Sequence, residues 1–440
     1  MSDMPTVSFF EVLRSAKGIL KNPLPFHHKN FQKHGDVFKV KLGLGNSVIF
    51  IRDAGLAKHM LQTQHKKYHK SPLQTKDLGK YIGNGLLTSN GAYWLKQRRL
   101  IQPAFYKKKL EVIVDTIRIA IKDELQRIEV GKPIDIYPLM NDLAFKVVAK
   151  SLFSYTDTKE TMPRLQYITE SAQKTLIKEI RQPYKLWWFY LSGTIRKAHM
   201  LTNEARTILN TIIEERRASD VEYDDLLDML LTSKYEDGSS MNNEQLIDEI
   251  LILFIAGHET TSNALSFCLM LLGKYPDVQE KMYKEIQKAS STELSISKQL
   301  EESEYTKACI EETMRLYPPA YFSDRIAIAD DTYKGMKFSK GTIFLISFFE
   351  IHRHTNFWTN PEDFNPERFN TLSKKELADW YFPFGAGPRM CVGSNFAMYE
   401  MIITVNEIIK THKITTKEKI EINPLITLQP KNAIVHFTKR

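Results

Sequence analysis

Residues 384 to 393 read Phe-Gly-Ala-Gly-Pro-Arg-Met-Cys-Val-Gly, and this stretch decides the fold. From Val392 onward, apolar residues recur at helical spacing, so Cys391 lies at or just before the N-terminus of a helix. Unpaired backbone N–H groups and the positive end of the helix dipole favour a thiolate there. The flanking glycines let a flat ligand approach the backbone closely, and Arg389 could reach an anionic edge of that ligand. Taken alone, the stretch also fits a buried structural cysteine in a glycine-containing loop.

The complete sequence of residues 384 to 393 resembles the cysteine loop of the cytochrome P450 family, whose members are haem-thiolate monooxygenases. The resemblance implies that the Cys391 thiolate binds the iron of haem b on its proximal face. It also implies that Phe384, Arg389 and Ala397 contact the haem. The reaction expected from the family is insertion of one oxygen atom of dioxygen into a substrate.

The composition is that of an ordinary globular protein, with 42% hydrophobic and 26% charged residues in a chain of 440. No apolar run approaches the roughly 20 residues that cross a bilayer, so no transmembrane anchor is expected. The three cysteines, Cys268, Cys309 and Cys391, are far apart in sequence and suggest neither a zinc site nor a disulfide framework. Cys268 and Cys309 fall in helical patterns and are expected in the core.

The net charge is +9, from 61 basic and 52 acidic residues scattered along the chain. Such a balance suits an acidic protein, nucleic acid or an anionic membrane surface, and it also fits a lysine-rich solvated surface. No nucleic-acid-binding motif accompanies the charge. The N-terminus lacks the pattern of a secretory signal, so a soluble cytoplasmic protein of bacterial type is expected, with a weak surface contact through Phe9, Phe10 and Val12 left open.

The pattern along the chain predicts a mainly α fold with a minor β region, which the resemblance identifies as the cytochrome P450 fold. Alternating residues 37–42 and 47–51 predict a β-hairpin, and residues 425–428 and 433–437 predict a final strand pair. Residues 354–383 are expected to form an ordered meander. The whole chain, 1–440, is expected to be one domain, with an α-rich core at about 53–316 and β regions at about 36–52, 321–347 and 411–440.

A short polar segment, Gly257-His-Glu-Thr-Thr261, follows the most apolar run of the chain. A buried acid beside a hydroxyl is costly unless it is paired or solvated, so the helix could also simply reach the surface here. The segment resembles the oxygen-binding helix of the P450 family. In that resemblance Thr260 and Glu259 are catalytic: Thr260 hydrogen-bonds dioxygen and Glu259 helps to deliver protons through water.

Glu312 and Arg315 are three residues apart and share one helix face, where ion pairs are common and weak. Together with the later Pro366-Glu-Arg-Phe369, they resemble the Glu-Arg-Arg cluster of the family. The resemblance implies a structural role, in which the cluster fixes the meander and the cysteine loop.

Further cations match positions that bind the haem propionates in the resembling family. Trp94 and Arg98 are spaced i, i+4 on one helix face, a pattern that also fits an amphipathic surface helix. Arg325 lies in an expected strand, and with Arg389 the set supplies three cations for two carboxylates.

Electrons are expected from a separate ferredoxin or flavodoxin, because no flavin or iron–sulfur segment is recognisable. Lys96, Arg99 and residues 107–109 are candidate docking cations for this acidic partner, and a monomer is expected. By family position the substrate is lined by Tyr81, Ile82, Ala256, Tyr321, Phe322 and Thr427.

That mainly apolar lining favours a lipophilic substrate such as a fatty acid, terpenoid or carotenoid. The sequence of residues 85–99 resembles that of the long-chain hydroxylase branch of the family. At the position where many of those enzymes carry a haem-linking glutamate, however, this chain has Ala256. The aromatic run 184–191 fits either a lid near the substrate or a buried cluster. Two other functions stay open: a peroxide-driven peroxygenase, and a non-catalytic haem sensor or lipid-binding protein.

Overall fold

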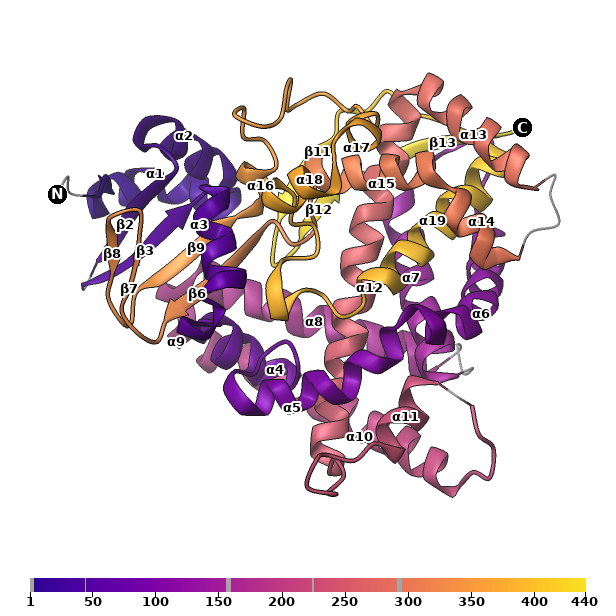
Figure 1. The fold of residues 1–440 in the computed structure, drawn as a ribbon. Helices are drawn as coiled ribbons and strands as arrows, with labels where there is room; N and C mark the ends of the chain where they lie inside the picture. The colour runs from indigo at the N-terminus through magenta and orange to yellow at the C-terminus, as the bar shows by residue number, and fades with distance from the viewer. Residues whose placement is uncertain (1–3, 44, 156–159, 224, 291–294) are drawn as a thin grey trace. The chain divides into compact units, whose positions relative to one another are not determined.

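The computed structural model describes residues 4–43, 45–155, 160–223, 225–290 and 295–440, which form two compact units. The first unit contains residues 1–72, 311–391 and 422–429, and the second contains 73–310, 392–421 and 430–440. The expectation of a mainly α fold with a minor β region is confirmed (Figure 1).

A six-stranded sheet with the strand order β1-β2-β3-β9-β6-β4 forms the centre of the first unit. Its strands are β1 (Thr6–Val7), β2 (Val37–Gly43), β3 (Asn46–Ile51), β4 (Tyr68–His69), β6 (Phe322–Ala327) and β9 (Ile343–Ser347). The expected hairpin is present, because β2 pairs antiparallel with β3 in the register Val37 to Ile51. β7 (Asp331–Tyr333) and β8 (Met336–Phe338) form a separate hairpin in the same unit.

Short helices accompany this sheet. They are α1 (Phe9–Lys21), α2 (Leu24–His34), α3 (Ala54–Lys58), α16 (Phe348–Ile351), α17 (Arg368–Thr371) and α18 (Lys374–Trp380), with the turns η1 (His59–Thr63), η2 (His65–Lys67) and η6 (Gly387–Arg389). Apolar side chains of β3, α3, β9 and α16 share one buried cluster that includes Ile51, Leu56, Phe344 and Ile351. Burial of these side chains from water holds the short elements on the sheet.

Helices make up most of the second unit. They are α4 (Gly79–Ile82), α5 (Gly91–Ile101), α6 (Lys107–Leu125), α7 (Ile136–Phe153), α8 (Thr161–Arg181), α9 (Leu186–Leu191), α10 (Thr194–Ala218), α11 (Leu226–Thr232), α12 (Asn243–Lys274), α13 (Pro276–Ser290), α14 (Ile296–Glu302) and α19 (Ser394–Thr411). The turns η3 (Leu73–Leu78), η4 (Gln102–Phe105) and η5 (Pro183–Lys185) connect them, and α15 (Glu304–Leu316) runs across the boundary of the units.

The longest helix, α12, is buried along most of its length and packs against α7 and α19 (Figure 1). It begins at a capping box, in which the Asn242 side chain accepts from the Gln245 backbone N–H and the Gln245 side chain accepts from that of Asn242. A three-stranded sheet of β5 (Pro133–Asp135), β13 (Ile434–Lys439) and β10 (His412–Thr415) completes the second unit.

The expected final strand pair is wrong. Residues 425–427 form the turn between β11 (Glu421–Pro424) and β12 (Leu428–Lys431), and β13 pairs with β10 and β5. Two short apolar runs close together suggested a hairpin, but β13 finds its partners more than 20 residues away in sequence. The two-residue and three-residue strands β4 and β5 were not expected, because alternation over so few residues carries no signal.

Candidate functional site

The cysteine loop is shaped by backbone hydrogen bonds and by two glycines with positive φ. The Cys391 N–H donates to the Phe384 carbonyl at 2.9 Å, which closes the loop three residues before α19 begins. Gly385 and Gly387 have φ of 72° and 70°. A Cβ at Gly387 would clash with the carbonyl oxygen of Leu61, so this position requires glycine. Cys391 is exposed, and the alternative of a buried structural cysteine is therefore wrong.

A group of basic side chains gathers in the same unit as the cysteine. Arg325 is 6% exposed and donates from Nη1 to the Ser323 hydroxyl and to the Asp324 carbonyl, both at 2.7 Å. Burial lowers the pKa of Arg325 to about 10, against the opposing effect of Asp324. The pKa of Arg389 is lowered to about 10 by burial and by the nearby charge of Arg325. Both guanidinium groups stay protonated at neutral pH.

His69 and Lys70 join this group from the end of β4. Burial lowers the pKa of Lys70 well below its usual range, and the charges of Arg325 and Arg389 lower it further. The pKa of His69 is also lowered, by burial and by Arg389. The nearby charge of Asp324 offsets part of the repulsion among these basic groups, and the remainder favours a further anion beside them. We define the basic cluster as His69, Lys70, Arg325 and Arg389.

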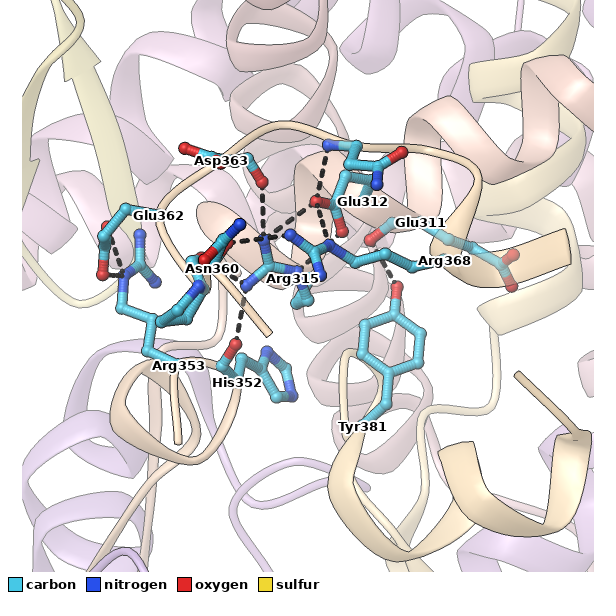
Figure 2. A network of polar contacts seen from close by, with 12 residues as sticks. Glu311, Glu312, Arg315, His352, Arg353, Asn360, Glu362, Asp363, Arg368 and Tyr381 are labelled. Atoms are coloured by element: carbon cyan, nitrogen blue, oxygen red, sulfur yellow. Dashed lines mark hydrogen bonds and ion pairs between the residues drawn. The ribbon is translucent and has the colours of Figure 1, made fainter. Parts of the chain in front are cut away.

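Glu312, Arg315 and Arg368 form the buried charge cluster that the sequence suggested (Figure 2). Glu312 accepts from Arg315 at 2.6 Å and 2.8 Å and from Arg368 Nε at 3.2 Å, and both Glu312 and Arg315 are 0% exposed. Arg315 also donates to the carbonyls of His352, Pro361 and Asp363. α15 is thereby connected to residues 352–368 of the meander. Because every group is paired, burial of these charges is tolerated.

The acid–alcohol segment lies within the continuous helix α12. His258 and Glu259 are 1% and 6% exposed, so the alternative that the helix surfaces here is wrong. The Thr260 hydroxyl donates to the Ala256 carbonyl at 2.8 Å. Ala256, Gly257 and Thr260 remain accessible while their neighbours in the helix are buried. Their spacing places them on one face, which makes this the accessible face of α12.

The remaining expected haem contacts belong to the second unit. Trp94 is 9% exposed, and Arg98 donates from Nε to the Gln102 side chain at 2.9 Å. Ala397 lies in the first turn of α19 and is half-buried. The structure therefore places Phe384, Arg389, Cys391 and Arg325 in the first unit. It places Trp94, Arg98, Glu259, Thr260 and Ala397 in the second.

The expected substrate residues have mixed surroundings. Tyr81 and Ile82 are buried, and the Tyr81 hydroxyl donates to Glu179 at 2.6 Å. Tyr81 also lines a pocket of about 380 Å³ in the second unit, together with Lys80, Arg206, Asp248 and other mostly polar residues. In the first unit the Tyr321 hydroxyl donates to the Leu425 carbonyl at 2.7 Å. The polar pocket does not match the apolar lining that the sequence suggested.

Three of the candidate docking cations form surface ion pairs. Lys96 lies 3.5 Å from Asp237, Arg99 pairs with Glu236, and Lys107 pairs with Glu301. Pairs of this kind are weak and are screened by salt, so an acidic partner can displace them. Among the helices of the described residues, none is long and apolar enough to span a membrane.

Comparison with known proteins decides the family, because the cytochrome P450 family model matches residues 5–437. The chain belongs to the cytochrome P450 family. It is 27% identical over 90% of its length to a cyclooctat-9-en-7-ol 5-monooxygenase of Streptomyces melanosporofaciens, of which 85% is covered. It is 26% identical over 94% of its length to a pentalenene oxygenase of Streptomyces avermitilis, of which 92% is covered. Cytochrome P450 4d2 of Drosophila melanogaster is 28% identical, with 88% of this chain and 83% of the relative covered.

As a cytochrome P450 monooxygenase, the chain uses the iron of haem b. The residues of the first unit suit that group in two respects. Cys391 is exposed, and Gly387, where a side chain would clash with the Leu61 carbonyl oxygen, fixes the shape of the loop that carries it. The basic cluster suits the two carboxylates that haem carries, since charge-assisted hydrogen bonds to carboxylates are strong.

The sequence did not indicate that His69 and Lys70 belong to the basic cluster of this cytochrome P450. They lie 255 residues or more before Arg325 and come close to it only because β4 pairs with β6, with His69 opposite Ile326. A two-residue strand leaves no periodic signal. The one local indication of their role is that the two basic residues are adjacent and directly precede Ser71-Pro72.

Proposed function

We propose that Cys391 is the proximal iron ligand of this cytochrome P450. The observation that carries the proposal is the exposed Cys391 in the same unit as the basic cluster. The haem, when bound, supplies the redox chemistry that activates dioxygen, and thiolate ligation favours cleavage of the O–O bond. Phe384 and Ala397 would contact the haem, and Arg389 and Arg325, with Trp94 and Arg98, would bind its propionates.

Thr260 and Glu259 are proposed as the catalytic pair. Thr260 presents its hydroxyl on the accessible face of α12, and Glu259 supplies a buried carboxyl next to it in sequence. A hydroxyl that donates to its own helix can exchange that bond for one to a water or a substrate oxygen. Glu259 would then pass protons to Thr260 through water, while the apolar residues around it keep other water out.

A lipophilic substrate is proposed, with terpenoids as the first class to test. Two relatives are named for oxidation of cyclooctat-9-en-7-ol and pentalenene, which favours terpenoids over fatty acids and carotenoids. The accessible Ala256 and Gly257 offer small, apolar contact surface beside Thr260. A fatty-acid or carotenoid substrate remains the second class, in line with the resemblance to long-chain hydroxylases.

A ferredoxin or flavodoxin is proposed as the electron donor, with residues 107–109, Lys96 and Arg99 as its docking cations. These basic residues would attract an acidic partner over several ångströms even while they form weak surface pairs. Salt should therefore slow reduction. A single-domain monomer in the cytoplasm is proposed as the working form.

Turnover with isotope-labelled dioxygen tests the proposal. Purified protein with a surrogate ferredoxin system and a terpenoid panel should give products that carry one labelled oxygen atom. Product formed with peroxide but not with dioxygen would favour a peroxygenase. Haem binding without product from any substrate class would favour a sensor or a lipid-binding protein.

A further inference from the structure

A short hairpin between α11 and α12 contacts α5 in the second unit. It is formed by residues 234–240, in which the Tyr235 N–H donates to the Ser239 carbonyl at 2.8 Å. Two adjacent acidic residues, Glu236 and Asp237, lie within its turn. We call residues 234–240 the acidic hairpin.

A buried hydrogen bond holds the acidic hairpin to α5. Gln97 of α5 is 0% exposed, and its side-chain amide donates from Nε2 to the Tyr235 hydroxyl at 3.0 Å. The Lys96 ammonium lies 5.2 Å from the centre of the same tyrosine ring. Helix α11, which leads into the hairpin, also packs against α5. The turn of the hairpin is therefore kept close to α5.

Two ion pairs join the acidic hairpin to the proposed docking cations. Asp237 lies 3.5 Å from Lys96, and Glu236 pairs with Arg99. Asp237 also accepts from the Ser239 hydroxyl at 2.5 Å and from the Ser239 N–H at 3.0 Å. These two hydrogen bonds are the main reason that the pKa of Asp237 lies below its ordinary value. The Asp237 carboxylate is thus charged at neutral pH and fixed in the turn.

The charge around the acidic hairpin is opposite to that of the chain as a whole. Residues 214–249 include 12 acidic and three basic residues, although the whole chain has a net charge of +9. The four side chains of the two ion pairs are 57% to 84% exposed. Exposed pairs are weak and solvent screens them, so a carboxylate of another protein can replace one of the hairpin without uncovering a buried charge. The contact is therefore exchangeable.

We propose that the acidic hairpin is an internal competitor of the electron donor, which occupies Lys96 and Arg99 until an acidic ferredoxin or flavodoxin displaces it. The inference rests on the docking cations proposed above and adds their regulation. A carboxylate attached to the same chain has a high effective concentration at its cation, so it competes with a free partner even though each pair is weak. A donor that presents several carboxylates at once replaces both pairs, which favours strongly acidic donors over weakly acidic ones.

A purely structural role explains the two ion pairs less well. The buried hydrogen bond between Gln97 and Tyr235 already fixes the hairpin, whereas exposed ion pairs add little to stability. The exposed Lys108 and Lys109 at the start of α6 would attract the donor first, and its carboxylates would then reach the cations that the hairpin occupies.

Binding of an acidic iron–sulfur ferredoxin to the full-length, haem-loaded protein tests the proposal. E236Q/D237N removes both carboxylates and should raise the affinity for the ferredoxin about three- to tenfold at low salt, measured by surface plasmon resonance. High salt should remove this gain, because it screens the ion pairs. D220N/E222Q is the matched control, since it removes the same charge from exposed sites of the neighbouring loop and should change the affinity much less. Unchanged affinity in E236Q/D237N would overturn the proposal.

A double-mutant cycle separates competition from a general change of charge. K96Q/R99Q should weaken ferredoxin binding more in the E236Q/D237N protein than in the wild type, because the hairpin of the wild type already occupies both cations. Equal losses in the two backgrounds would show that the hairpin carboxylates act only through the overall field, which contradicts competition. Far-UV circular dichroism checks that each variant is folded.

Failure of the docking surface itself would give a different result. K107Q/K108Q/K109Q and added salt test that surface independently of the hairpin. If neither changes ferredoxin binding, the proposed docking cations are wrong and the competitor is overturned with them. If both weaken binding while E236Q/D237N has no effect, the docking surface stands and the competitor alone is overturned.

Discussion

The Nε atom of Arg368 lies 3.2 Å from Oε1 of Glu312, and the same oxygen accepts from the Asn365 backbone N–H at 2.9 Å. One buried carboxylate thus binds the meander through a side chain and through the backbone. Arg315 occupies the other side of Glu312 and reaches three carbonyl groups of the segment from residue 352 to 363. This part of the meander lacks regular secondary structure, and the hydrogen bonds of the cluster hold it in place instead.

Replacement of Glu312 by alanine should therefore destabilise the protein strongly. The change leaves Arg315, which is 0% exposed, without its carboxylate, and breaking a buried pair costs about 3 to 5 kcal/mol. Denaturant titration measures the free energy of unfolding. Glu418→Ala is the matched control, because Glu418 is exposed and its loss should change little. Equal effects of the two variants would contradict the structural role of the cluster.

Loss of a cation from the basic cluster should weaken haem retention. Lys70→Ala removes an ammonium group close to Arg325 and Arg389, and a charge-assisted hydrogen bond of this kind is worth about tenfold or more in affinity. Transfer of haem to an excess of an apo-globin measures the rate of loss. Lys337→Ala, at an exposed site, is the control. Identical rates for wild type and Lys70→Ala would place the propionates away from this cluster.

The stability of the second unit should depend on pH through Glu249 of α12. Glu249 is 0% exposed, its Oε2 accepts from the Leu86 N–H at 2.9 Å, and burial raises its pKa from the ordinary 4.5 to about 8. Between these values the folded state holds a proton that the unfolded state has released. The contribution of Glu249 to stability therefore falls as pH rises from 5 to 8, by up to about 4 kcal/mol, while the buried histidines His27 and His352 contribute in the opposite direction.

The variant Glu249→Gln should remove that dependence, since glutamine does not titrate. The comparison is the free energy of unfolding at pH 5 and pH 8 for the wild type, Glu249→Gln and Glu244→Gln. Glu244 is 81% exposed and its variant should follow the wild type. A wild type whose stability changes between pH 5 and pH 8 as much as that of Glu249→Gln would contradict the buried, protonated state of Glu249.

Thr260→Ala should lower product formation with dioxygen by about 10- to 100-fold and leave the peroxide-driven reaction nearly intact. The hydroxyl is required for proton delivery to dioxygen, whereas peroxide already carries its protons. Thr260→Ser should restore much of the dioxygen reaction. The measurement is product formed per electron pair consumed. Full coupling in Thr260→Ala would show that the hydroxyl has no such role.

The parts of the site that the sequence predicted are those with local spacing. Glu312 and Arg315 share a helix face, and the cysteine loop is contiguous, so their resemblance to motifs of the family could be recognised in the sequence. The burial of Glu259 could not be predicted, because it depends on helices that pack around α12. Lys70 was missed because a two-residue strand brings it to Arg325.

The same distinction explains the error at the C-terminus. β13 pairs with β5, which is separated from it by about 300 residues, and the sequence offers no sign of that partner. The hairpin of β2 and β3 was predicted because its strands are adjacent and alternate over several residues. Local patterns identified elements, whereas pairing between distant segments had to come from the structure.

The most direct test of Cys391 as the iron ligand is the carbon monoxide difference spectrum of the reduced protein. The wild type should show the long-wavelength band of thiolate ligation, and Cys391→Ser should lose it while Cys268→Ser and Cys309→Ser, which change buried core cysteines, keep it. A wild type that binds haem without this band, or a Cys391→Ser variant that retains it, would contradict the central claim.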